Sequence, residues 1–286
     1  MKHYQSITLW LVVFLLSAAK PIGESSLAAG YGIAKSMFAN TKTIQSLSYV
    51  MTKQERINGK MVKQQSFTKF TKSPFRVYIR QQAPKNGLEV LYVKGQNNNK
   101  ALINPNGFPW ITIKANPMGS LMREKQHHTL YESGFDHVVS ILEYLCQRYE
   151  SQINSMIKNE GSITWDGRPC WIISFNNPYF KYEKYTVKKG ETVLDIAAQR
   201  KLSEYMILEH NELNDYDDIS EGDVIEIPNA YSPKLTLYVD KQRNIPMFME
   251  VYDDKGLYEH YEYSDVVVNP SFNDEEFSKT YAEYGF

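Results

Sequence analysis

The pattern of apolar and polar positions predicts a chain built mostly of short β-strands. Between residues 75 and 80, Phe, Val and Ile alternate with Arg, Tyr and Arg, so one face of this strand is apolar and the other polar. Asn58-Gly59, a dipeptide typical of tight hairpin turns, separates two such runs, and Asp166-Gly167 separates two more. The predicted strands are 47–57, 61–71, 75–80, 88–93, 100–103, 162–166, 169–175, 235–239, 247–252 and 257–268. We expect an antiparallel meander, with 108–113 as a further apolar stretch.

Two stretches have helical periodicity. Residues 26–40 form one, and 135–156 form the other, in which Val138, Ile141, Leu142 and Leu145 share a stripe. A curved sheet with an apolar inner face must be filled, and these helices are available to fill it. The sequence leaves open whether they and the many aromatic residues form a packed core or leave a ligand cavity.

The stretch 185–228 reads as a small unit of strand, helix, helix and strand. Thr192 and Ser203 stand where helix N-caps belong, and Met206, Ile207 and His210 are predicted to point inward from the second helix. Because the strand series resumes after this stretch, we expect the strands before 177 and after 234 to belong to a single sheet.

The same stretch resembles a LysM domain, the glycan-binding module of cell-wall proteins. The likeness rests on a Y-x-V-x-x-G-x-T opening, on Ile196-Ala197, on N-x-L from residue 211, on I-x-x-G from residue 219 and on a closing Ile227-Pro228. Glu191 departs from the Asp more usual in the family. The resemblance implies binding of peptidoglycan or another N-acetylglucosamine glycan in a shallow groove formed by Gly190, Glu191, Thr192, Val193, Asn211, Leu213, Asn214 and Ile219.

The flanking sequence carries a second resemblance. S-P-F-R-V-Y-I-R from residue 73, G-L-E-V-L-Y-V from 87 and I-P-M-F-M-E-V-Y from 245 are similar to an exported bacterial family of unknown function, numbered fifteen seventy-one, which itself resembles periplasmic lipoprotein carriers (LolA-like half-barrels). This implies an α+β fold: a curved antiparallel unclosed β-barrel wrapped around helices, with an inserted βααβ LysM-like module. The expected division is a discontinuous β domain of 26–182 and 231–286, with lipid or acyl chains as candidate ligands, and the module at 185–228.

Residues 1–19 predict a signal peptide. Lys2 precedes an apolar run at 7–16, and Ser17-Ala18-Ala19 resembles a cleavage site. We therefore expect a periplasmic or otherwise exported protein, soluble after cleavage. In that compartment Cys146 and Cys170 could be two buried thiols or one disulfide, and their spacing does not decide between them.

Charge is unevenly distributed along the chain. Residues 41–125 contain 15 Lys or Arg against 3 Asp or Glu, whereas 185–228 contain 4 against 11 and 229–286 contain 5 against 11. Either the basic and acidic parts attract each other when folded, or a basic face meets anionic lipid or wall polymers.

The residues needed for catalysis do not form a recognisable motif. Cys146 lies in the middle of a predicted helix on its apolar side. The adjacent His127-His128 cannot share one face, so surface or hairpin histidines are expected rather than a metal site. The carboxylates Asp253, Asp254, Glu259, Glu262 and Asp265 are interpreted as exposed charges. We expect a non-enzymatic envelope protein without cofactor, metal or nucleic-acid partner. The alternatives are a wall or lipid hydrolase with unplaced carboxylates and a structural protein without sugar binding.

Overall fold

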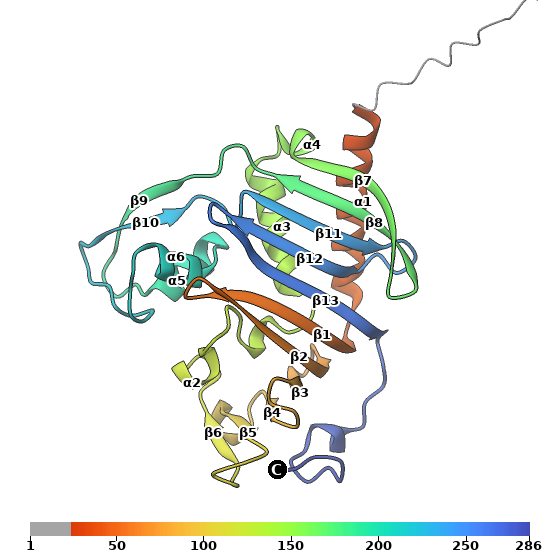
Figure 1. Cartoon of the computed structure of the whole chain (residues 1–286), viewed down its shortest axis with the longest axis vertical. Coiled ribbons are helices and arrows are strands. Elements are labelled where there is room, and N and C mark those ends of the chain that lie inside the picture. Colours follow the sequence, from red (N-terminus) through yellow and green to blue (C-terminus); the bar gives the residue numbers. More distant parts are fainter. Residues whose placement is uncertain (1–23) are drawn as a thin grey trace, which may run out of the picture.

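The main feature of the fold is one long, curved antiparallel sheet (Figure 1). The computed structural model describes residues 24–286, so the predicted signal peptide lies outside the described residues. Eleven strands follow the order β6-β5-β4-β3-β2-β1-β13-β12-β11-β8-β7, and the sheet stays open between its edge strands β6 and β7. The strands are β1 (Ser46–Ile57), β2 (Lys60–Thr71), β3 (Arg76–Ala83), β4 (Glu89–Val93), β5 (Ala101–Asn104), β6 (Ile113–Ala115), β7 (Ile157–Trp165), β8 (Arg168–Asn176), β11 (Lys234–Asp240), β12 (Pro246–Asp253) and β13 (Gly256–Val268). The predicted unclosed antiparallel sheet is confirmed.

Both hairpins predicted from dipeptides are present. Asn58 and Gly59 have φ of 49° and 73° between β1 and β2, and Asp166 and Gly167 have φ of 48° and 68° between β7 and β8. Left-handed backbone at both central residues is what a two-residue turn between antiparallel strands requires.

Helices fill only one half of the curved sheet. α1 (Glu24–Thr43), α3 (Asp136–Arg148) and the short α4 (Ile153–Met156) pack on the half formed by β7, β8 and β11–β13, as Figure 1 shows. The buried residues at this contact include Met37, Leu145, Met156, Phe175 and Leu237. Gly30 brings α1 close to β7, since a Cβ there would lie 2.8 Å from the carbonyl carbon of Lys158. Among residues 24–286, no helix combines the length and apolar composition needed to cross a membrane.

The prediction of one helix over 135–156 is wrong in its second half. The helix ends at Arg148, and the chain turns through residues 149–152 before α4. Tyr149 leaves helical geometry, and its hydroxyl accepts a hydrogen bond from Asn177 Nδ2 at 3.3 Å. Residues 150–152 have no apolar side chain that would hold a continuous helix on the core.

The segment 182–228 has the order β9 (Tyr182–Thr186), α5 (Val193–Arg200), α6 (Glu204–His210) and β10 (Val224–Pro228). β9 and β10 form their own antiparallel pair, and Thr192 and Ser203 cap the two helices. A small core holds Val193, Ile196, Ile207 and Ile227 together. On either side of the segment, Asn176 of β8 pairs with Lys234 of β11, so the large sheet continues across it.

Helix α6 faces two cores at once. Ile207 packs inside the segment, whereas its neighbour Met206 and also Tyr205 pack into the core beneath the large sheet. His210, predicted to point inward, instead stacks on Tyr182 with ring centroids 3.6 Å apart, at the edge of the segment. The segment is therefore joined to the rest of the protein through side chains as well as through its ends.

The two faces of the first half of the sheet differ from the prediction at one strand. Tyr78 was predicted on a polar face of β3, but it is buried, because the C-terminal segment crosses this convex face and stacks Tyr284 on it with ring centroids 3.7 Å apart. Phe277 of the same segment is buried beside it. The alternation of residues 75–80 is correct, but a distant segment covers the second face.

The apolar stretch 108–113 contributes little to the sheet. Only its last residue belongs to a strand, the three-residue β6. Phe108, Trp110 and Ile111 are 88%, 77% and 63% exposed. The sequence indicated only an apolar stretch here, and the structure places most of it in solvent.

Candidate functional site

A cavity of about 420 Å³ lies on the concave face of the half-sheet that the helices leave free. The strands supply it with alternating inward residues, as the period of two dictates. These are Tyr49, Met51, Lys53 and Glu55 of β1, Val62, Gln64, Ser66 and Thr68 of β2, Ile79 and Gln81 of β3, Val90 of β4 and Ile103 of β5. The open question of a packed core or a cavity therefore has a divided answer: helices fill one half of the sheet, and a cavity occupies the other.

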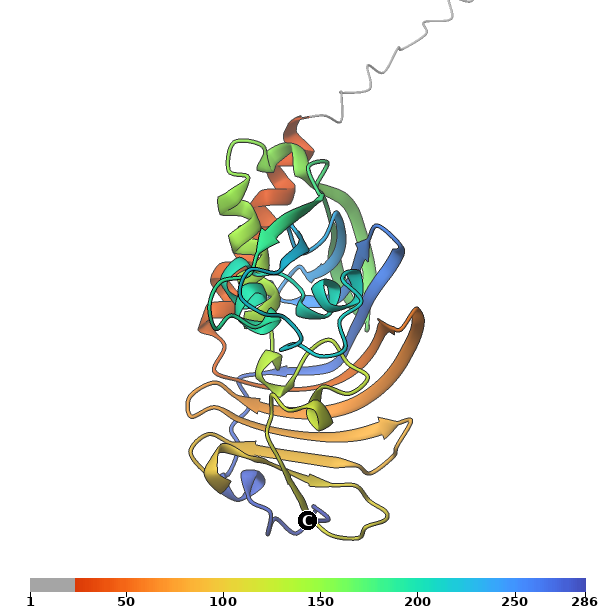
Figure 2. The same ribbon diagram turned by 90° about the vertical axis from the view of Figure 1, so that its left-hand side faces the viewer.

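The opposite wall of the cavity is the segment after β6, which crosses in front of the strands (Figure 2). It includes the short α2 (Ser120–Arg123) and runs on to α3. Met122 and Leu130 face the cavity from buried positions, and Gly134 is tied to the sheet by its N–H, which donates to the Tyr49 hydroxyl at 3.3 Å. The mouth opens to solvent where exposed side chains reach the rim, namely Pro84, Lys85, Leu121, Glu124 and Lys125.

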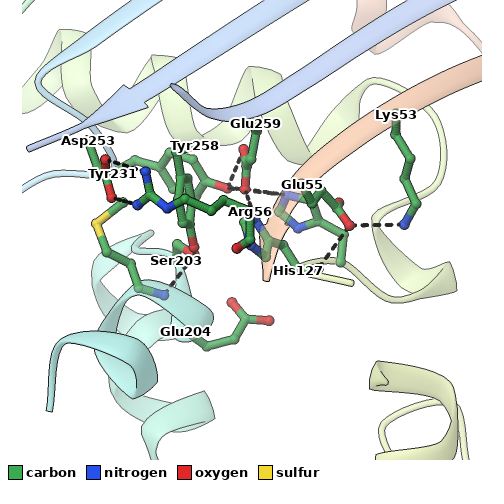
Figure 3. A network of polar contacts seen from close by, with 12 residues as sticks. Lys53, Glu55, Arg56, His127, Ser203, Glu204, Tyr231, Asp253, Tyr258 and Glu259 are labelled. Carbon is green, nitrogen blue, oxygen red and sulfur yellow. Dashed lines mark hydrogen bonds and ion pairs between the residues drawn. The ribbon is translucent and has the colours of Figure 1, made fainter. Parts of the chain in front are cut away.

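The inner end of the cavity is closed by a buried group of ionisable side chains, which we call the histidine–glutamate cluster: Glu55, His127, His128, Tyr231, Glu259 and Tyr261 (drawn in part in Figure 3). Glu259 accepts from the Tyr231 hydroxyl at 3.0 Å and lies 2.8 Å from His127 Nδ1. Glu55 accepts from the Tyr261 hydroxyl at 2.6 Å and from the backbone N–H of His127 at 3.1 Å. The cluster joins β1, β13 and the wall segment.

His127 occupies the centre of this cluster. Its second ring nitrogen lies 3.0 Å from the Arg56 carbonyl oxygen, which can only accept, as can the Glu259 carboxylate on the other side. Tyr258 and Tyr205 stack on the ring with centroids 4.3 and 4.6 Å away. The prediction of a surface histidine is wrong here, because His127 is fully buried.

Within and beside the cluster, burial and neighbouring charges shift the pKa values of two histidines in opposite directions. Burial alone would lower the pKa of His128, but the charge of Glu259 and a hydrogen bond with it raise that pKa to about 9. Burial would raise the pKa of Glu259, yet the histidines hold it well below its usual value. His137, in the same cavity, has a pKa lowered to about 3 by burial and by the charge of His128. At neutral pH the inner end therefore holds a cationic His128, an anionic Glu259 and a neutral His137.

A second polar network connects the cavity wall and the sheet to helix α6. The Ser203 and Tyr258 hydroxyls are 2.7 Å apart, Arg123 donates to Glu204 at 2.6 Å, and Glu209 lies 3.7 Å from Arg56. Arg56 also forms a buried ion pair with Asp253. These contacts pair the basic first part of the chain with the acidic segment, as one of the two interpretations of the charge distribution expected.

The eight predicted glycan-binding residues lie on two loops that meet. The N–H of Val193 donates to the Tyr216 carbonyl at 2.8 Å, which brings the loop before α5 beside the loop after α6. Within the set, Gly190 and Asn214 are exposed and Val193 is fully buried. The others also have structural contacts: Glu191 accepts from Tyr185, Thr192 caps α5, Asn211 bridges α6 and β10, and Leu213 and Ile219 pack against the small core.

The residues considered for catalysis are mostly buried and already paired. Glu259 and Asp253, interpreted as exposed charges, are buried in the networks above, so that interpretation is wrong for both. Cys146 and Cys170 are free buried thiols, and burial raises their pKa to about 12 and about 11. Within the described residues, no group of three or more His, Cys, Asp or Glu side chains is arranged to hold a metal ion.

Sequence reasoning left a cavity open as an alternative but did not locate it, although a signal was present. Lys53 and Glu55 occupy the same inward register of β1 as Tyr49 and Met51, so two charges follow two large apolar residues on one face. A charged pair in an otherwise apolar row marks a site where the face is not simply core. Lys53 is a near partner of Glu55, but His127 and Tyr261, which also bind this carboxylate, lie 72 and 206 residues away, so the cluster itself could not be predicted from the pattern.

Comparison with known proteins gives the family. The model of the family described as "Protein of unknown function (DUF1571)" matches residues 44–207, more than half of the chain. The chain belongs to the DUF1571 family. This confirms the second resemblance, and the matched range runs from β1 through the cavity into α6. None of the curated proteins matches this DUF1571 chain.

Several solved structures resemble the DUF1571 chain at low identity. A chain of the Pseudomonas aeruginosa MucA/MucB complex is 12% identical with a TM-score of 0.41, over 87% of this chain and 60% of that one. The Mycobacterium tuberculosis lipoprotein LppX is 11% identical with a TM-score of 0.41, over 86% and 98%. A LolA superfamily protein from Nitrosomonas europaea is 9% identical with a TM-score of 0.34, over 88% and 98%. The chain thus spans less than two thirds of the matched MucA/MucB chain.

Proposed function

We propose that this DUF1571 protein is an exported envelope protein that binds an amphiphile, with an acyl chain held in the concave cavity, and that it does not transform this ligand. The observation that carries the proposal is the cavity itself. Its volume of about 420 Å³ falls in the range of about 300–1,000 Å³ typical of small-molecule sites. Met51, Val62, Ile79, Val90 and Leu130 offer apolar walls, and the histidine–glutamate cluster offers a polar end.

Binding without chemistry fits the state of the reactive groups. Glu55 and Glu259 each accept several hydrogen bonds, and their lowered pKa values keep both carboxylates charged and unable to act as acids. The two thiols are protonated and lie in apolar clusters away from the cavity lining. The export of the protein rests on the signal peptide predicted at residues 1–19.

The cavity proposal is tested with a matched pair of substitutions on one strand. Ser66→Trp on β2 points into the cavity and should fill it, whereas Lys63→Trp on the same strand adds an identical side chain at an exposed position outside the lining. We expect native mass spectrometry of freshly purified protein to show a bound acyl ligand, and a fluorescent fatty acid to bind the parent and Lys63→Trp but not Ser66→Trp. Equal binding by both variants, or no acyl ligand with any of the three proteins, contradicts the proposal.

We also propose that the segment 182–228 binds peptidoglycan or another N-acetylglucosamine glycan. The LysM resemblance suggests it, and the contact between Val193 and Tyr216 supports it by placing the two loops side by side. Binding should be weak, because a shallow groove makes few contacts and an acidic segment is repelled by anionic wall polymers.

Point substitutions test the glycan proposal better than removing the segment, because α6 contributes Tyr205 and Met206 to the main core. Asn214→Ala removes an exposed amide of the predicted groove, and Asp217→Ala is a control on the same loop. We expect co-sedimentation with purified sacculi to fall for Asn214→Ala and to hold or rise for Asp217→Ala. Unchanged sedimentation of Asn214→Ala would remove the groove from consideration.

A further inference from the structure

The loop between β5 and β6 presents large apolar side chains to solvent although hydrogen bonds hold its backbone in place. Phe108, Trp110 and Ile111 are mostly exposed. The Trp110 N–H donates to the Gly107 carbonyl at 2.7 Å, and Asn106 Nδ2 donates to the Asn86 carbonyl at 3.0 Å, so the turn is fixed to its neighbour. A fixed turn that holds an aromatic pair outward is unusual in a monomeric protein unless the surface meets a partner.

The loop shares one edge of the sheet with two other turns. This edge is the one formed by the ends of the strands, and not one of the two edge strands. In an antiparallel meander alternate connections lie at the same edge, so the β1–β2 turn at 58–59, the β3–β4 turn at 84–88 and the β5–β6 loop at 105–112 stand together. Figure 2 shows these three connections along one side of the molecule. Pro84 and Lys85 of the middle turn also form the rim of the cavity. The exposed apolar loop therefore lies next to the cavity mouth.

This edge is basic. Lys60, Lys63, Lys85 and Lys114 are exposed at or beside the three connections, and residues 57–63, 81–88 and 104–115 contain no Asp or Glu. Among the described residues none of these four lysines has a carboxylate within ion-pair distance, whereas the buried Lys53 and Arg123 of the same half are paired with Glu55 and Glu204. These four unpaired lysines give the surroundings of the apolar loop a positive charge with no acidic residue in the three connections.

We propose that this edge docks the protein on an anionic lipid bilayer, with Phe108, Trp110 and Ile111 entering the interfacial region and the lysines facing the head groups. Aromatic side chains favour the head-group level of a bilayer, and lysines beside them are attracted by anionic lipids. A second copy of the chain is a poorer occupant, because two such edges would bring their lysines together. The docked orientation points the cavity mouth toward the membrane. The docking itself does not depend on what the cavity holds.

The test uses the predicted mature chain, residues 20–286, so that the apolar run 7–16 does not bind vesicles on its own. Trp165→Phe with Trp171→Phe leaves Trp110 as the single tryptophan of residues 20–286. We expect Trp110 emission to shift to shorter wavelength, and to be quenched by brominated acyl chains, when vesicles contain phosphatidylglycerol but not when they are phosphatidylcholine alone. Added salt should weaken the effect.

Co-sedimentation with the same vesicles identifies the residues. Phe108→Ser with Ile111→Ser, and separately Lys60→Glu with Lys85→Glu, should lower binding about tenfold or more. Val224→Ser with Val267→Ser removes two exposed apolar side chains elsewhere and should bind like the parent. An unshifted Trp110, equal sedimentation of the loop variant and the control, or a Trp110 shift that accompanies dimer formation without vesicles overturns the proposal.

Binding of a fluorescent fatty acid below its micelle concentration separates the two proposals. The loop variant should keep this binding and lose vesicle binding, and Ser66→Trp should do the reverse. If both variants lose only fatty-acid binding, docking by the loop fails while the cavity proposal stands.

Discussion

Tyr205 of helix α6 stacks on the buried ring of His127, with ring centroids 4.6 Å apart. His127 belongs to the histidine–glutamate cluster at the inner end of the cavity, and the hydroxyl of Tyr205 accepts from the backbone N–H of Asn58, in the turn between β1 and β2, at 2.9 Å. One aromatic residue of the inserted segment thus contacts both the cluster behind the cavity and the β1–β2 turn. The segment is part of the architecture of the cavity.

We predict that the segment and the sheet unfold together. Met206→Ala and Ile207→Ala remove neighbouring, fully buried side chains from the main core and from the small core, and each should cost about 2–5 kcal/mol of unfolding free energy. The segment contains no tryptophan, so the fluorescence of Trp165 and Trp171 reports on the sheet alone. In urea, both variants should lower the midpoint of one transition seen equally by fluorescence and by circular dichroism. A fluorescence midpoint that stays in place for Ile207→Ala would mean that the segment unfolds independently.

Glu259→Gln should lower the raised pKa of His128 toward its ordinary value. The substitution keeps the shape of the side chain but removes the charge that raises the pKa of His128 to about 9, so that pKa should fall by at least about one unit. Loss of one partner in a buried charged cluster should also lower the unfolding free energy at pH 7 by about 3–5 kcal/mol. Histidine NMR titrations measure the first effect, with His128→Gln assigning the resonance. Glu262→Gln, on the same strand beside His260, is the matched control and should leave His128 titrating as in the parent.

The two cavity histidines predict a stability maximum near pH 6.5. Between about pH 3 and 6.5 the unfolded chain binds a proton at His137 that the folded chain does not, so stability falls as pH falls through this range. Between 6.5 and about 9 the folded chain keeps a proton on His128 that the unfolded chain has lost, so stability falls as pH rises. Urea midpoints across pH 5–9 measure both limbs. His137→Gln should reduce the slope between pH 5 and 6.5 by about 1.4 kcal/mol per pH unit, and an unchanged slope would show that His137 does not titrate in this way.

Two glycines of α1 should respond in opposite directions to the same change. A Cβ on Gly30 would meet the backbone of Lys158 at 2.8 Å, so Gly30→Ala must push the helix off β7 and should cost about 1–3 kcal/mol. A Cβ on Gly32 has no atom within 4 Å, so Gly32→Ala should gain up to about 1 kcal/mol from helix propensity. Urea unfolding of the two variants makes the comparison, and equal effects would contradict the close approach of α1 to β7.

Local patterns predicted the local parts of this fold. Asn58-Gly59 and Asp166-Gly167 specified their hairpins because the backbone preference of two residues decides such a turn. Thr192 and Ser203 marked the starts of α5 and α6 for the same reason, since a cap depends on atoms within three residues. The alternation of residues 75–80 likewise predicted an apolar face for this strand, and Ile79 on that face lines the cavity.

What the sequence did not reveal depends on residues far apart in the chain. Glu259 looked like an exposed charge because its partner His127 is 132 residues away. Tyr78 looked solvent-facing because Tyr284, which covers it, comes from the other end of the protein. The exposure of Phe108 and Trp110 could not be predicted either, because hydrophobicity alone does not say whether an apolar side chain contacts a core or a partner.

The pairing of β1 with β13 also affects the order in which the protein can fold. β1 meets its neighbour β2 within one hairpin, but on its other side Leu47 pairs with Val268, more than 200 residues later. A chain that emerges from its N-terminus can form the hairpins of the cavity half early, while the other edge of β1 waits for a strand that begins at Gly256. Joining the two halves of the sheet is therefore a late step that closes a very long loop, and we expect it to limit the folding rate.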